Sequence, residues 1–157
     1  MGKIEKFEDI IAWQEARGLA NKVYGLCRAI EQKKDYALSD QIKRASISIM
    51  ANIAEGFGRR SSKEFAQFLF TSKASASELQ SHLYIALDQK CLGSEEFADL
   101  YKNLEYIQRL ISNFIKYLRN NPNSMNRMDS TNPIDSTNPT NSMNPTNSMN
   151  PTNSINS

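Results

Sequence analysis

The chain has 157 residues, of which 39% are apolar, so it can form one domain with a modest hydrophobic core. A formal net charge of +2 is too small to indicate a nucleic-acid partner by itself. No segment approaches the roughly 18 continuous apolar residues of a membrane span, and the first residues lack the apolar run of a signal peptide. We therefore expect a cytoplasmic protein with no membrane partner.

Apolar residues recur at steps of three and four in four segments, and this spacing predicts four helices. The first is expected from residue 8 or 9 to residue 31. The second is expected from residue 39 or 40 to residue 55, with Ser39 as its N-cap. Gly56 is expected to end that helix in the left-handed conformation, which glycine adopts without a Cβ clash.

The third helix is expected to begin after Ser61, which forms a capping box with Glu64 three residues later. It should end near residues 90–92, before Gly93. Ser94 is the expected N-cap of the fourth helix, whose apolar stripe continues to Leu118. Lys116 and Arg119 near its end suit the negative end of the helix dipole.

Four long helices with short loops predict an all-α, antiparallel up-down-up-down four-helix bundle over residues 1–120. Residues 121–157 consist mostly of Asn, Pro, Thr, Ser and Met, with the hexapeptide NPTNSM occurring twice in succession. Such a segment cannot bury enough surface to offset the entropy of ordering, so we predict a disordered low-complexity tail. The tail is either an inert product of repeat expansion or a flexible tether.

No catalytic residue is predicted, and neither is a metal or a cofactor. His82 is the one histidine of the chain, and a di-metal site in a bundle would need a second one. We expect His82 to be a helix-face residue satisfied by a neighbour. Glu55 has no evident ionisable partner for acid–base work. Cys27 and Cys91 lie far apart without zinc-type spacing and should be free thiols.

The second helix is apolar nearly all round, although a helix in a lone bundle should keep one solvent face. We therefore expect its second face to meet another subunit. A polar network should fix helix register there, and its expected members are Arg44, Ser48, Asn52, Glu55 and Gly56. The two charged members are expected to pair with other helices or subunits, because an unpaired buried charge is costly. Glu55 should also cap backbone donors near the following turn.

Three segments carry a family resemblance: FEDIIAWQEARGLANKVYGL, LSDQIKRASISIMANIAEGFGRRSSKEFAQFL and SASELQSHLYIA. They resemble the four-helix-bundle proteins encoded in intervening sequences of bacterial 23S ribosomal RNA genes. That family also includes the accessory variability protein of diversity-generating retroelements. The resemblance covers about residues 5–118 and is most specific from Gln41 to Gly56. One departure is SKASASEL, where the family often has a Gly-Ser pair.

The resemblance implies a ring-like homopentamer. It also implies an association with nucleic acid or with a reverse transcriptase for some members, and it supplies no catalytic residue. The tail has no counterpart in the family.

Basic residues gather around both ends of the second helix and the start of the third. The candidates for phosphate contacts are Lys43, Arg44, Arg59, Arg60, Lys63 and Lys73. These are either solvated surface charges or a surface that binds the backbone of RNA or DNA, with salt-sensitive affinity and no base readout. The sequence thus favours a non-enzymatic, homo-oligomeric, nucleic-acid-associated bundle. The alternative is a structural or protein-interaction module with no nucleic-acid role.

Overall fold

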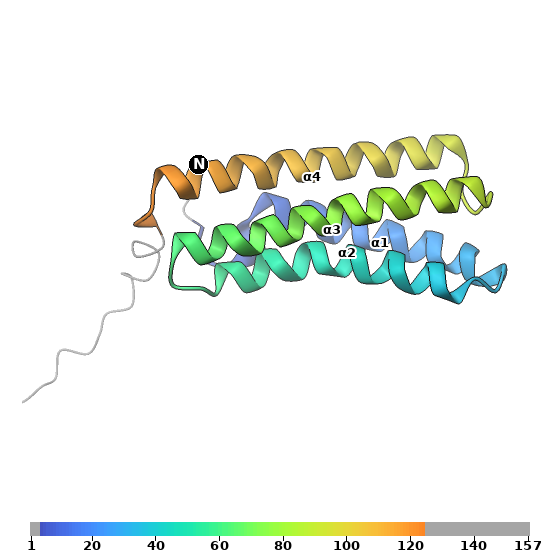
Figure 1. Cartoon of the computed structure of the whole chain (residues 1–157), viewed down its shortest axis with the longest axis horizontal. Coiled ribbons are helices and arrows are strands. Elements are labelled where there is room, and N and C mark those ends of the chain that lie inside the picture. The colour runs from blue at the N-terminus through green and yellow to red at the C-terminus, as the bar shows by residue number, and fades with distance from the viewer. Residues whose placement is uncertain (1–3, 125–157) are drawn as a thin grey trace, which may run out of the picture.

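The computed structural model describes residues 4–124. This part of the chain forms a short 3-10 helix, η1 (Phe7–Asp9), followed by four α-helices and no strand. The helices are α1 (Ile11–Gln32), α2 (Tyr36–Phe57), α3 (Ser62–Asp88) and α4 (Ser94–Asn120). They lie along one long axis, and short turns at alternate ends join each helix to the next (Figure 1). The predicted all-α four-helix bundle is confirmed.

Side chains from the four helices meet in one continuous core. Its fully buried members include Ile30, Ile42, Ile49, Ile53, Phe65, Leu69, Leu79, Leu83, Leu104 and Ile111. At one end, the Phe65 and Phe114 rings meet edge to face with centroids 5.0 Å apart, a favoured geometry for aromatic pairs. Both cysteines are free, as expected, and burial raises the pKa of the Cys27 thiol.

The first two helices begin at residues other than those expected. Asp9 does not open α1; its carboxylate accepts the backbone N–H groups of Glu5 and Lys6 and closes η1 instead. The prediction of Ser39 as the N-cap of α2 is wrong. Asp35 is the N-cap, and its Oδ1 accepts the backbone N–H of Leu38 at 3.1 Å. Ser39 lies one turn inside the helix.

Gly56 does not end α2, and this prediction is also wrong. The helix continues to Phe57, with Gly58 at the C-cap in a right-handed conformation. In the described residues no glycine has a positive φ, whereas Lys34 and Lys90 do, with φ of 64° and 56°. These lysines occupy the left-handed positions after α1 and α3, where the sequence pattern would lead one to expect glycine.

The ends of α3 and α4 follow the prediction more closely. The Ser61 hydroxyl accepts the backbone N–H of Glu64 at 3.2 Å and donates to its carboxylate at 2.9 Å. Helix α3 ends at Asp88, slightly before the expected stop. Ser94 is the first residue of α4 and not its cap, since Gly93 occupies the N-cap position without a side chain.

Two further contacts close the ends of the bundle. The Lys33 ammonium donates to the carbonyls of Gln89 and Lys90 at 2.9 and 2.7 Å, which joins the α1–α2 turn to the α3–α4 turn. At the other end, the buried Ser124 hydroxyl lies 3.2 Å from the Ser62 hydroxyl. Packing therefore continues four residues beyond the end of α4. The rest of the predicted tail, residues 125–157, lies outside the described residues. No helix in the described range is long and apolar enough to cross a membrane.

Candidate functional site

One member of the expected polar network, Ser48, joins α2 to α3, and a second, Asn52, bonds to Ser48 within α2. The Asn52 amide donates to the carbonyl and the hydroxyl of Ser48, at 2.8 and 3.1 Å. The Ser48 hydroxyl in turn lies 2.8 Å from the hydroxyl of Ser75 on α3. One turn away, the fully buried Ser72 donates to the carbonyl of Ile49 at 2.7 Å. Small hydroxyl residues on both helices thus set how α2 and α3 lie against each other.

The two charged members of that set do not enter this network. Arg44 is exposed, and its nearest acidic partner is Asp40, one turn earlier, at 3.9 Å. Glu55 pairs with Arg59, one turn later, and makes no cap to the backbone. Both charged side chains therefore pair within the same helix region and are in contact with solvent. Neither is a buried charge that needs a partner from another subunit.

Gly56 acts in the α2–α3 contact through its missing side chain. A Cβ on Gly56 would lie 2.5 Å from Cδ2 of Phe65 and 2.8 Å from Cβ of Phe68. Real Cβ atoms essentially never come so close to other heavy atoms. Glycine at this position is thus required by the close approach of α3, and not by the backbone conformation.

Lys43 has an internal role. Its ammonium pairs with Glu31 on α1, and the Ser39 hydroxyl donates to the same carboxylate at 2.7 Å. The hydrogen bond from Lys43, followed by that from Ser39, lowers the pKa of Glu31. The same hydrogen bond raises the pKa of Lys43. This pair links α1 to α2, so Lys43 is already neutralised within the chain.

The other basic residues proposed for phosphate contacts lie in different parts of the bundle. Arg59 and Arg60 lie in the α2–α3 turn, some 22 Å along the bundle from Arg44 at a rise of about 1.5 Å per helical residue. Arg59 pairs with Glu55, and its guanidinium lies 4.7 Å from the centroid of the Phe68 ring. Arg60 is exposed.

Lys63 and Lys73 lie near the contact between α3 and α4. The Gln108 amide of α4 donates to Ser77 and Gln80 of α3 at 3.0 and 3.1 Å, which marks the side of α3 that meets α4. At about 100° per residue, Lys73 falls between Ser77 and Gln80 around the α3 axis. Lys63 lies roughly 15 Å earlier along the same helix.

Arg119 lies close to Lys63, although the sequence analysis named it only as a residue that suits the helix dipole. Lys63 and Arg119 both line a surface hollow of about 340 Å³ between the start of α3 and the end of α4. The other lining residues are Ser62, Ala66, Gln67, Phe70, Leu118 and Pro122. We call Lys63, Lys73 and Arg119 the basic seam. In the described part of the chain, none of the three forms an ion pair.

Phe70 is also not among the candidate residues that the sequence predicts. Its side chain is 44% exposed, and the Arg119 guanidinium lies 5.1 Å from the centroid of its ring. One signal was present in the sequence: FAQFLF contains three phenylalanines, and the last falls off the buried stripe of α3. An aromatic ring at such a position does not serve the core.

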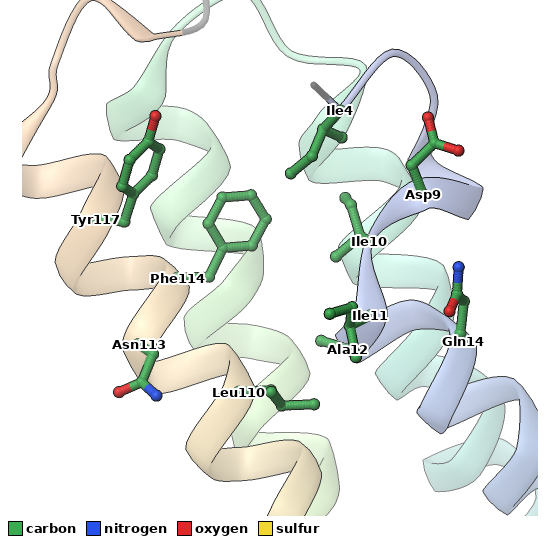
Figure 2. A pocket seen from close by; sticks show the side chains of 10 residues that line it. All are labelled: Ile4, Asp9, Ile10, Ile11, Ala12, Gln14, Leu110, Asn113, Phe114 and Tyr117. Atoms are coloured by element: carbon green, nitrogen blue, oxygen red, sulfur yellow. The ribbon is translucent and has the colours of Figure 1, made fainter. Parts of the chain in front are cut away.

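A second hollow, of about 610 Å³, lies between the start of α1 and the end of α4. Figure 2 shows Phe114 and Leu110 of α4 across the gap from Ile10 and Ala12. The lining is mostly apolar. Its one carboxylate, Asp9, is held by backbone N–H groups, as described above. This groove suits an apolar contact better than acid–base chemistry.

His82 lacks the hydrogen bond from a neighbour that the sequence analysis predicts. Its Nε2 atom is buried and has no hydrogen-bond partner, although the Glu78 carboxylate lies 3.6 Å away. Within residues 4–124, no group of three or more His, Cys, Asp or Glu side chains is arranged to hold a metal ion.

Comparison with known proteins assigns the family. Residues 8–113 match the family model described as 23S rRNA-intervening sequence protein. The chain belongs to this family. The family predicted from the sequence is thereby confirmed, while the link to retroelement accessory proteins stays a prediction.

One solved structure similar to this family member is a protein of unknown function from the S23 ribosomal protein family of Bacteroides thetaiotaomicron. The two chains are 22% identical and superpose with a TM-score of 0.64. The match covers 68% of this chain and 99% of that one, and at this identity it supports the fold alone. No curated protein matches the chain.

The SKASASEL stretch lies at the α2–α3 contact. Ser72 and Ser75, within this stretch, make the hydrogen bonds to Ile49 and Ser48 described above. Serine hydroxyls of this stretch therefore join α3 to α2.

Proposed function

We propose that this 23S rRNA-intervening sequence protein is a non-enzymatic, homo-oligomeric bundle that associates with nucleic acid through the phosphate backbone. The observation that carries the proposal is the basic seam, whose three cations form no ion pair in the described residues. Arg60, in the turn that precedes α3, is a further exposed cation at the end of the bundle that holds Lys63 and Arg119. Unpaired cations on a rigid surface are suited to phosphate oxygens.

The expected binding is electrostatic and little dependent on sequence. Each phosphate neutralised releases counterions, so affinity should fall steeply as salt rises. Arg59 and Lys43 are expected to contribute less than the seam, because Glu55 and Glu31 already neutralise them. Arg44 is the ninth of the 22 residues of α2, about 22 Å along the bundle from Arg59, and would meet a different stretch of the ligand.

The oligomer is proposed from the outer face of α2. Ile47 is 42% exposed, and Ala51, one turn later, is also exposed. These residues would bury apolar surface against a second copy of the chain. Five subunits, and a reverse transcriptase as a protein partner, are suggested by the family resemblance alone.

Titration of labelled RNA and DNA by fluorescence anisotropy, at about 20 and 200 mM salt, tests the nucleic-acid function. We expect binding at low salt that weakens by at least about tenfold at high salt. A triple variant, Lys63→Gln, Lys73→Gln and Arg119→Gln, should lose most of this binding. The matched control removes the same charge elsewhere, from Arg17 and Arg28 of α1 and from Lys102 in the first half of α4.

The control variant should bind as the wild type does. Equal losses in both variants would mean that net charge, and not the seam, drives binding. If the wild type binds neither RNA nor DNA at low salt, the nucleic-acid function is wrong. The apolar groove between α1 and α4 then favours the second candidate function, a protein-interaction module.

A further inference from the structure

The hollow at one end of the basic seam has an aromatic wall. Phe65 and Phe114 are buried in the core of the bundle, but Phe70 keeps 44% of its side chain exposed. No other helix of the described chain covers this part of the ring. The ring therefore offers a flat apolar surface to whatever occupies the hollow.

Arg119 holds that ring in place. Its guanidinium lies 5.1 Å from the ring centroid, within the range of a cation–π contact. A guanidinium that stacks on one side of a ring still has N–H groups at its edge for a phosphate. Arg119 can thus position Phe70 and bind an anion at the same time.

The rest of the hollow supplies complementary chemistry. Ala66 and Leu118 form an apolar floor, while Lys63 and Gln67 bring an ammonium and an amide to the rim. A volume of about 340 Å³ is enough for one base but not for a folded partner. One flat apolar wall, two cations and one amide match the parts of a single nucleotide: the base, its phosphate and the base edge.

A paired base could not use this wall. In a duplex the bases stack on one another, and only their edges and the phosphates are accessible. An unpaired base has a free face, and stacking on an aromatic side chain is the usual way in which proteins bind single strands. The strand could then follow α3 for roughly 15 Å to Lys73.

We infer that the α3–α4 hollow is a single-strand site, in which an unpaired base stacks on Phe70 and its phosphate binds Lys63 and Arg119. The inference rests on the proposed nucleic-acid function and adds a preference for unpaired strands. It also predicts that Phe70 contributes only to the binding of single strands, whereas the basic residues contribute to the binding of every nucleic acid.

The test compares a labelled 12-nucleotide oligo(U) with a 12-base-pair RNA duplex in anisotropy titrations at about 20 mM salt. Wild type should bind the single strand more tightly. Phe70→Leu keeps an apolar side chain but removes the π face, and it should weaken oligo(U) binding by at least about fivefold. Binding of the duplex should not change. Phe70→Trp should restore oligo(U) binding, since indole stacks at least as well.

The Phe70→Trp variant provides a second readout. The chain has one native tryptophan, Trp13, which lies on α1 and packs against Phe7. Tryptophan emission of the variant should fall as oligo(U) is added and stay constant with the duplex. Emission of the wild type should not respond to either.

Three results would overturn the inference. Equal affinity of wild type for both ligands, with no change in Phe70→Leu, would leave the proposed function standing but remove the stacking site. A shift in molecular mass on light scattering in Phe70→Leu would assign the ring to a subunit contact. Failure of wild type to bind either ligand would remove the proposed function together with the site.

Discussion

Gly56 lies in the contact between α2 and α3, and its role depends on the side-chain atom that glycine lacks. Glycine after a helix usually indicates a left-handed cap, because it lacks a Cβ. The same missing atom also permits close helix contact, and the sequence does not distinguish these two uses. Here the atoms that crowd Gly56 come from the next helix: two ring carbons of Phe65 and the Cβ of Phe68.

Substitution Gly56→Ala should destabilise the bundle. The new Cβ would lie 2.5 Å from the Phe65 ring, so side chains or backbone must shift, at a cost of about 1–3 kcal/mol. Gly18→Ala is the control, since it is also within a helix but has nothing within 4 Å of the added Cβ. That variant should gain about 0.5–1 kcal/mol from helix propensity. Urea unfolding followed by circular dichroism measures both; a stabilised Gly56→Ala would refute the close-contact role.

At the scale of the helices, the Glu31–Lys43 pair predicts how stability depends on pH. Lys43 first, and Ser39 second, lower the pKa of Glu31 below its ordinary value of 4.5. Its stabilising contribution is therefore complete above pH 4.5 and is lost as pH falls through the lowered pKa. For Lys43, whose pKa is raised above 10.5, the contribution is complete below pH 10.5 and is lost as pH rises through the raised value.

Glu31→Gln should therefore flatten the acid limb of the stability profile below about pH 4.5. Lys43→Gln removes the main partner of Glu31 and should flatten the same limb. The double variant should add little to either single variant, because both remove one interaction. Thermal unfolding at intervals from pH 2 to pH 7 would measure this. Additive effects in the double variant would show that the two side chains act separately.

The helices themselves could be predicted, because the spacing of apolar residues at steps of three and four is a local property of the chain. The helix ends are harder to predict, since Asp35 and Ser39 are both good N-cap residues. In the structure Asp35 accepts the backbone N–H of Leu38, whereas the Ser39 hydroxyl donates to Glu31. Lys63 and Lys73 could be named from the sequence as candidate phosphate contacts, but their grouping with Arg119 could not. Arg119 meets Phe70 only after two helices have packed side by side, 49 residues apart in the chain.

At the scale of the whole molecule, the outer face of α2 predicts assembly. Ile47 and Ala51 are exposed there between the charged residues Arg44 and Glu55. Ile47→Glu should prevent a second copy from packing on this face, and it should leave the monomer folded because the side chain is not in the core. Light scattering at about 10 μM should give a monomer mass for this variant and a larger mass for wild type.

Ile85→Glu is the matched control, because Ile85 is 46% exposed but lies on α3. It should keep the mass of the wild type. Ile47→Glu should also lower affinity for long single strands and reduce the salt dependence, although every residue of the basic seam remains. The reason is that an oligomer presents several seams to one strand, and these act with a high effective concentration. A monomeric wild type, or unchanged strand affinity in a monomeric variant, would contradict this link between assembly and binding.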